Sequence, residues 1–153
     1  QPVTEPKRVT VNRKARFDYE ILETIEAGLV LTGNEIKAIR EGRVSVSEAY
    51  AKPEGGELWL VNAHIAQYAP GTESGLDPTR PRKLLLHRTQ IVQLSKQVAE
   101  RGLTIVPLKL YLKRHYAKVE LGLARGRRQY DKRRVIIERD RKREAREGVS
   151  RRR

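Results

Sequence analysis

The chain has 153 residues, and its 33 Lys and Arg against 19 Asp and Glu give a formal charge of +14. That length suits one domain with its own core, and the absence of cysteine excludes disulfides and thiolate metal sites. No apolar run reaches the roughly 18 residues of a membrane span, and the first residues lack a signal-peptide pattern. We therefore expect a cytoplasmic protein whose excess charge serves a polyanionic partner such as nucleic acid.

The charge divides the chain into parts. Residues 1–12 contain two prolines and few apolar residues, and we expect a flexible N-terminal arm. Residues 13–125 form the predicted body. Residues 126–153 are a strongly basic C-terminal tail whose few apolar residues are contiguous rather than helically spaced. We expect this tail to be disordered when free and helical on a partner.

The first predicted elements lie between residues 17 and 42. Apolar residues at alternate positions from Phe17 to Leu31 predict two strands or one bent strand, with a bulge or turn at Gly28. Thr32 followed by Glu35 fits a capping box, so a short helix should run from there to Gly42. The box accounts for Glu35, and we do not assign it to a site.

The middle of the chain mixes strands, a loop and a helix. A Pro-Glu-Gly-Gly turn at 53–56 precedes a predicted strand over 57–65. A polar loop follows over 66–83, and its length is typical of a functional or mobile segment. A helix is predicted over 87–101, with Gly102 as its stop signal.

The clearest pattern is a hairpin over 108–123, with leucines alternating with basic and aromatic residues. It predicts one apolar face and one basic, aromatic face. The tip at 114–116 lacks Asn-Gly, so we expect a turn longer than a tight type I′ turn. Together these elements predict a mainly β fold: a small OB-like β-barrel with short flanking helices and a basic C-terminal tail.

The residues carry little that points to catalysis. The three histidines lie far apart and show no metal-ligand spacing. Neither a Gly-x-Ser-x-Gly elbow nor a Gly-x-x-x-x-Gly-Lys loop is present. We therefore expect no enzyme, no cofactor and no metal.

Basic clusters point to nucleic acid instead. They lie at 13–16, 80–83, 125–128 and 131–134. Arg and Lys supply the phosphate contacts that dominate nucleic-acid affinity, and nearby tyrosines offer stacking faces. The alternative for each cluster is an ordinary solvated surface.

Ten short segments in order resemble one family, small protein B, the SsrA-binding protein of bacteria. They are Asn12–Arg16, Asp18–Tyr19, Glu26–Gly28, Asn62–Ile65, Asp77–Pro78, Arg82–Leu86, Pro107–Tyr111, Ala117–Val119, Leu123–Gly126 and Tyr130–Arg133. The resemblance implies an OB-like barrel that binds the tRNA-like domain of transfer-messenger RNA (tmRNA) in the rescue of stalled ribosomes. It also implies a tail in the empty mRNA channel, with elongation factor Tu and alanyl-tRNA synthetase engaged through the RNA. A general RNA-binding OB-fold protein is the alternative.

The basic clusters and the resemblance together give the candidate RNA-binding residues. They are Arg13, Lys14, Arg16, Glu26, Arg82, Lys83, Leu85, His87 and Lys118. The resemblance carries four of them, each with a competing interpretation: a plain surface position for Glu26, core packing for Leu85, a helix N-cap for His87 and solubility for Lys118.

The candidate ribosome-contacting residues of the tail are Gly126, Arg127, Arg128, Tyr130, Asp131, Lys132 and Arg133. Tyr130 stands where some relatives carry His. Both rings can stack on a base, but only His can become positively charged near neutral pH.

Overall fold

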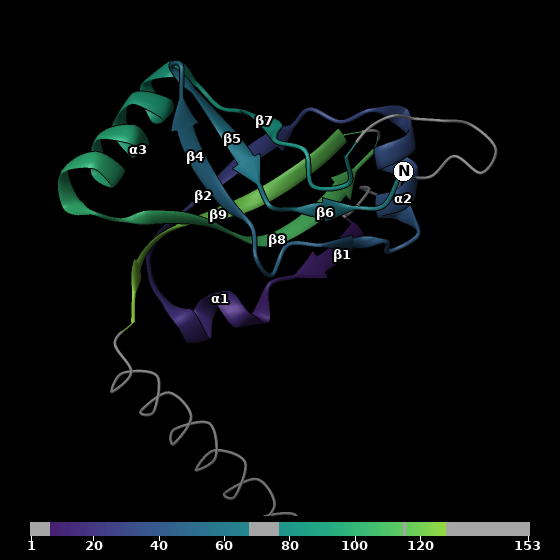
Figure 1. The fold of residues 1–153 in the computed structure, drawn as a ribbon, viewed down its shortest axis with the longest axis horizontal. Helices are drawn as coiled ribbons and strands as arrows, with labels where there is room; N and C mark the ends of the chain where they lie inside the picture. Colours follow the sequence, from purple (N-terminus) through teal and green to yellow (C-terminus); the bar gives the residue numbers. More distant parts are fainter. Residues whose placement is uncertain (1–6, 68–76, 115, 128–153) are drawn as a thin grey trace, which may run out of the picture.

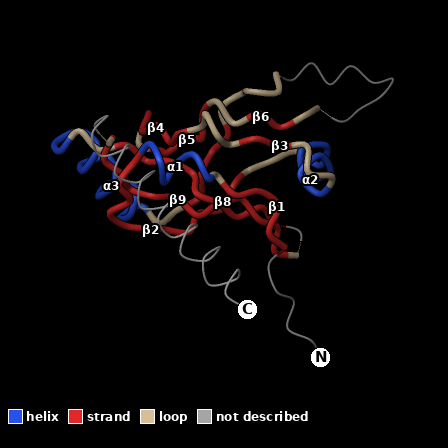
Figure 2. Tube along the Cα trace, turned by 90° about the horizontal axis from the view of Figure 1, so that it is seen from below, coloured by secondary structure: helices blue, strands red, loops and turns tan. Residues whose placement is uncertain are grey.

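The computed structural model describes residues 7–67, 77–114 and 116–127. In chain order the elements are β1 (Lys7–Val11), α1 (Arg13–Asp18), β2 (Tyr19–Leu29), α2 (Gly33–Arg40), β3 (Val44–Ser45), β4 (Tyr50–Glu54), β5 (Glu57–Val61), β6 (His64–Ile65), β7 (Arg82–Leu85), α3 (Arg88–Arg101), β8 (Thr104–Lys113) and β9 (Tyr116–Gly126). Strands dominate, as the sequence predicts. α2 and α3 lie at opposite ends of the strands, and α1 lies below them (Figures 1 and 2).

The main sheet curls into a ring of antiparallel strands. Its order is β1-β8-β4-β5-β7-β2-β9, and β9 also pairs with β8. The pairing therefore runs from β8 around the ring and returns to β8, with β1 attached outside it. The link between β4 and β8 is the residue pair Ala51 and Ile105. A barrel-like β fold with short flanking helices is thus confirmed.

The core lies inside this ring. Side chains of alternate strand residues point inward and are completely buried, and they include Leu58, Leu60, Leu84, Val119 and Leu121. A second, smaller apolar cluster joins Ala15 of α1 to Val106, Leu108 and Ala124. α1 therefore covers one end of the β8–β9 hairpin from the outside and leaves the rest of that surface open.

The predicted flexible arm is wrong for residues 7–11. They form β1, with Lys7 opposite Leu112 and Val11 opposite Lys109. The buried side chain of Asn12 holds this segment in place: its Nδ2 donates to the carbonyl of Pro107 at 2.8 Å, and its Oδ1 accepts from the main-chain N–H of Ala15 at 3.2 Å. Asn12 is thus the N-cap of α1, a helix that local patterns did not indicate. Residues 1–6 lie outside the described residues.

β2 is a single strand, and its irregularity is not at Gly28. The register with β9 shifts between Ile21 and Glu23, whereas Gly28 pairs regularly with Lys118. Gly28 instead provides space, because a Cβ atom there would lie 3.3 Å from the Cβ of Leu85.

The helices follow their sequence signals closely. The capping box of Thr32 and Glu35 is present at the start of α2, and α3 ends at Gly102 in the left-handed conformation with φ of 63°. The strand predicted over 57–65 is two strands, because Asn62 has a positive φ of 62°.

The hairpin tip is shorter than predicted. Lys113 pairs directly with Tyr116, which leaves two residues for the turn. Arg114 supplies a positive φ of 58°, the backbone conformation that a tight primed turn requires. The other turn residue, His115, lies outside the described residues.

Candidate nucleic-acid interface

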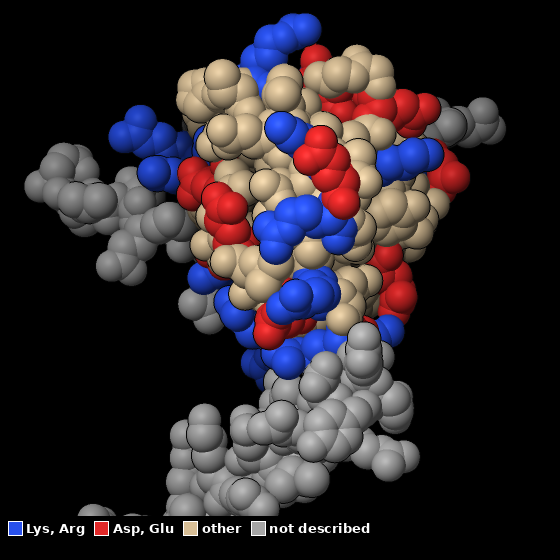
Figure 3. Space-filling model, turned by 90° about the vertical axis from the view of Figure 1, so that its left-hand side faces the viewer, with Lys and Arg blue, Asp and Glu red and all other residues tan. Residues whose placement is uncertain are grey.

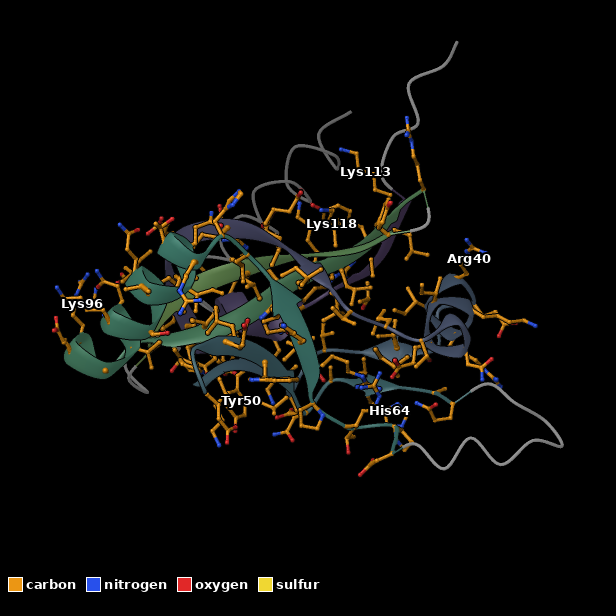
Figure 4. All side chains as sticks on the ribbon, turned by 90° about the horizontal axis from the view of Figure 1, so that it is seen from above. Arg40, Tyr50, His64, Lys96, Lys113 and Lys118 are labelled. Carbon is orange, nitrogen blue, oxygen red and sulfur yellow. The ribbon has the colours of Figure 1, made fainter. Side chains whose placement is uncertain are left out.

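Four strands bring one row of side chains to the outside of the ring. Across β7, β2, β9 and β8, Leu85 pairs with Gly28, Gly28 with Lys118, and Lys118 with Tyr111. Directly paired residues project to the same face of a sheet. We call the exposed surface around this row the outer face. Figure 4 shows Lys118 and Lys113 on one side of the strands, with Tyr50 and His64 on the other.

Leu85 is the informative member of the row. Its side chain is 53% exposed, whereas that of the neighbouring Leu84 is 0% exposed. The competing interpretation of Leu85 as a core residue is therefore wrong. Val30 and Tyr116 are also exposed large apolar side chains, near the same end of the hairpin. The outer face thus offers apolar surface beside the amine of Lys118.

A second row places carboxylates beside the first. Glu26 on β2 pairs with Glu120 on β9, which pairs with Lys109 on β8. The hydroxyl of Tyr111 donates to the exposed carboxylate of Glu26, and Lys109 Nζ lies 3.6 Å from Glu120. Partial burial and the nearby Glu26 raise the pKa of Tyr111, so its hydroxyl stays a donor at neutral pH.

This mixture of groups can do more than attract phosphates. Ammonium groups contact phosphates, a carboxylate can accept from base amino groups and 2′-hydroxyls, and apolar side chains can pack on bases or sugars. Acidic and basic side chains are also interspersed over the α3 end of the molecule (Figure 3). Such a surface combines groups that can contact the phosphates, the sugars and the bases of an RNA.

His87 lies at the edge of the outer face, two residues after Leu85. It is the N-cap of α3, as the competing interpretation expected, and its main-chain N–H donates to the side-chain oxygen Oε1 of Gln90 at 3.0 Å. The residue is exposed, so its imidazole remains available to a ligand.

The three cations of α1 differ in their surroundings. Lys14 forms an ion pair with Glu48 at 2.7 Å, and the hydrogen bond with this carboxylate raises the pKa of Lys14. Arg13 and Arg16 are exposed and form no ion pair with an acid among the described residues. The predicted cluster therefore divides into one paired and two unpaired cations.

Arg82 must be removed from the predicted RNA-binding residues. It is 0% exposed, and its guanidinium bonds to Glu35 and to the carbonyls of Ala63 and Pro78. In β7 it points inward with Leu84, whereas Lys83 points outward with Leu85. Lys83 remains accessible, although its Nζ lies 3.8 Å from Glu57.

Glu35 is the important residue that sequence reasoning set aside. Beyond its capping role, it is the buried acceptor for both Arg80 and Arg82. The signal depends on the bounds of β7: alternation along this strand places Arg82 on the same inward side as Leu84, and a buried arginine needs an acid nearby.

The first two residues assigned to the tail belong to the body. Gly126 is the last residue of β9 and pairs with Tyr19. The main-chain N–H of Arg127 donates to the carbonyl of Asp18 at 2.9 Å, and its guanidinium bonds to the carbonyls of Arg16 and Tyr19. The other predicted tail residues lie outside the described residues: Arg128, Tyr130, Asp131, Lys132 and Arg133.

Within residues 7–67, 77–114 and 116–127, no three His, Cys, Asp or Glu side chains gather as a metal site would require. In the same ranges, none of the helices combines the length and apolar character needed to cross a membrane.

A ring of antiparallel strands whose outer face combines lysines, carboxylates and exposed apolar side chains is typical of a β-barrel protein of the nucleic-acid-binding class. The model of the SmpB protein family matches residues 9–151. Similar proteins include the "SsrA-binding protein" of Thermobifida fusca, 52% identical over 97% of this chain and 92% of the relative. That of Carboxydothermus hydrogenoformans is 52% identical over 90% of this chain and 93% of the relative. The chain belongs to the SmpB family.

A solved structure agrees with this assignment. It is described as "tmRNA-SmpB: a journey to the center of the bacterial ribosome". Its matching chain is 49% identical and superposes with a TM-score of 0.67, covering 84% of this chain and 94% of the other.

Proposed function

We propose that this protein binds the tRNA-like domain of tmRNA and acts in trans-translation, the rescue of stalled ribosomes. The names of its relatives and the tmRNA–SmpB assembly of the similar structure support this function. The observation that carries it is the outer face, where an exposed leucine lies beside an exposed carboxylate and a lysine. These are the groups that the family resemblance assigns to RNA contact.

The proposed RNA-binding residues are the predicted ones without Arg82. They are Arg13, Lys14, Arg16, Glu26, Lys83, Leu85, His87 and Lys118. Two elements with distant positions in the sequence, β2 and β9, supply Glu26 and Lys118 at adjacent levels of the same face. This arrangement supports one continuous RNA contact rather than separate ones.

We propose a division of labour within the chain. The body binds RNA, and the basic segment that follows Arg127 enters the mRNA channel of the ribosome. Elongation factor Tu and alanyl-tRNA synthetase would be engaged through the RNA, in the cytoplasm, and the protein itself would act as an adaptor rather than as an enzyme. The charge of the segment supports this division, because channel walls of ribosomal RNA are polyanionic.

The test is competition binding in about 150 mM salt, where exposed charges are partly screened. The labelled ligand is the transcribed tRNA-like domain, and the competitors are an elongator tRNA and an unrelated hairpin. We expect a preference of about a hundredfold, or about 2.7 kcal/mol. Equal competition by all three RNAs would identify a general RNA binder instead.

Deletion of residues 128–153 separates the two proposed parts. The deletion begins after Arg127 because the contacts of that residue belong to the body. We expect affinity for the tRNA-like domain to stay within about threefold, which is below about 0.7 kcal/mol. Tagging of nascent chains on stalled ribosomes should be lost. Loss of tight RNA binding in this variant would refute the division.

A further inference from the structure

A groove separates α1 from the β8–β9 hairpin. Its lining includes Arg13 and Arg16 of α1, Lys109 of β8 and Glu120 of β9. Leu108 and the N-cap residue Asn12 also line it. We call this feature the α1 groove.

The groove has more positive than negative charge. Three cations line it, and the single carboxylate, that of Glu120, is shared with Lys109 at 3.6 Å. Arg13 and Arg16 are exposed and lack an acid partner among the described residues. A guanidinium offers planar, paired donors that match the oxygens of a phosphate. Two such groups beside a lysine can therefore bind one phosphate group through several charge-assisted hydrogen bonds.

Both ends of α1 are fixed to the body. At its start, the main-chain N–H of Asn12 donates to the carbonyl of Leu108 at 2.7 Å, and its side chain bonds to Pro107. At its end, the Arg127 guanidinium donates to the carbonyls of Arg16 and Tyr19 at 3.3 and 3.2 Å. The two arginines therefore project from a short helix whose position is set before any ligand arrives, which lowers the entropic cost of binding.

The groove continues directly into the outer face. Lys109 and Glu120 belong to its lining and are also paired in the row that contains Glu26. An RNA strand that contacts Glu26 and Lys118 is thus within reach of the α1 groove. Lys14 does not line the groove and pairs with Glu48 instead.

We propose that the α1 groove binds backbone phosphates of the RNA held on the outer face, through Arg13, Arg16 and Lys109. The proposal rests on the proposed function and assigns separate roles to neighbouring cations of one helix. Arg13 and Arg16 bind phosphate. Lys14, which pairs with Glu48, lies outside the groove.

The test compares two double variants of the full chain that remove the same charge. Arg13→Gln/Arg16→Gln removes two cations of the groove, and Arg40→Gln/Lys96→Gln removes two exposed cations, one on α2 and one on α3, that lie outside the groove and outside the proposed RNA-binding residues. Affinity for the tRNA-like domain is measured over a range of KCl concentrations. We expect the slope of log K against log salt to fall by about 2 in the groove variant, about one per phosphate contact, with little change in the control.

Two further arms make the result decisive. Arg13→Lys/Arg16→Lys restores the charge and should restore most of the salt slope, and thermal unfolding checks that each variant is folded. Equal slopes for the two Gln variants would overturn the groove proposal, because overall charge would then explain the effect. The wild-type preference for the tRNA-like domain tests the proposed function separately: without that preference the function fails, whatever the slopes show.

Discussion

The carboxylate of Glu35 and the guanidinium of Arg82 are both completely shielded from solvent and bond to each other inside the protein. Arg82 Nε and Nη2 donate to the same Glu35 oxygen at 2.9 and 2.6 Å. Arg80 donates to the carboxylate as well. This network joins α2 to the start of β7, the strand that presents Lys83 and Leu85 outward. A buried ion pair therefore sets the orientation of part of the outer face.

We expect Glu35→Gln to destabilise the fold by about 3–5 kcal/mol, because it leaves the charge of Arg82 buried without its partner. The measurement is equilibrium unfolding in urea. Glu41→Gln serves as the control, because Glu41 is exposed just after the same helix and its replacement should change the free energy by less than about 0.5 kcal/mol. Equal effects in the two variants would contradict the structural role of the pair.

The same carboxylate should make stability depend on pH. Burial by itself would raise the pKa of Glu35, but hydrogen bonds from Thr32, Arg80 and Arg82 outweigh it, so the pKa lies below the usual 4.5. A carboxyl with a lowered folded-state pKa stabilises the fold above its unfolded value and loses this contribution as pH falls through the folded value. The stability gap between wild type and Glu35→Gln should therefore shrink below about pH 4.5. Urea unfolding at several pH values measures it; a constant gap would refute the prediction.

Adjacent leucines of β7 should separate RNA binding from stability. Leu85→Ala removes an exposed side chain, so the unfolding free energy should change little, while affinity for the tRNA-like domain should fall about tenfold, or about 1.4 kcal/mol. Leu84→Ala opens a cavity in the core and should cost about 2–5 kcal/mol of stability. Urea unfolding and RNA titration of both variants check this. Unchanged RNA affinity in Leu85→Ala would exclude Leu85 from the interface.

Gly28 should be needed for the shape of the outer face. In Gly28→Ala the added Cβ would lie 3.3 Å from the Cβ of Leu85, so that side chain must shift, at a cost of about 1 kcal/mol or more in stability. We expect severalfold weaker RNA binding. In Gly33→Ala the added Cβ meets nothing within 4 Å, and RNA affinity should stay unchanged. Equal affinities for both variants in RNA titrations would contradict the prediction.

The sign of the effect at Glu26 distinguishes two roles. If Glu26 is only a surface charge, Glu26→Ala should tighten binding to every RNA, because it removes a negative charge. As an acceptor for 2′-hydroxyls or base amino groups, it should instead weaken binding to the tRNA-like domain by about tenfold, or about 1.4 kcal/mol. We expect the second result. Glu23→Ala, an exposed position on the same strand, controls for charge, and an unrelated hairpin controls for specificity.

Elements defined by local patterns could be predicted from the sequence. The alternation of leucines marks the β8–β9 hairpin, and the capping box marks the start of α2. The first strand and helix could not be predicted in this way, because Asn12 is held by carbonyls of residues 46 and 107, far along the chain. Contacts with distant residues produce no hydrophobic periodicity around Asn12, so a local pattern does not indicate them.

The candidate site shows the same limit. A run of basic residues reveals charge but not the side of the strand to which each side chain points. The sequence therefore does not distinguish Arg82, which points inward, from Lys83, which points outward. Lys14 likewise differs from Arg13 and Arg16 through a distant residue, Glu48. The exposure of Leu85 could not be predicted without the register between β7 and β2, which pairs Leu85 with Gly28.

The contacts of Arg127 fix the point from which the basic segment continues. The 26 residues from 128 to 153 start from a fixed point beside α1. Inserting residues directly after Arg127 would displace every later residue without altering its chemistry. The composition of this segment and its distance from the body can therefore be varied independently.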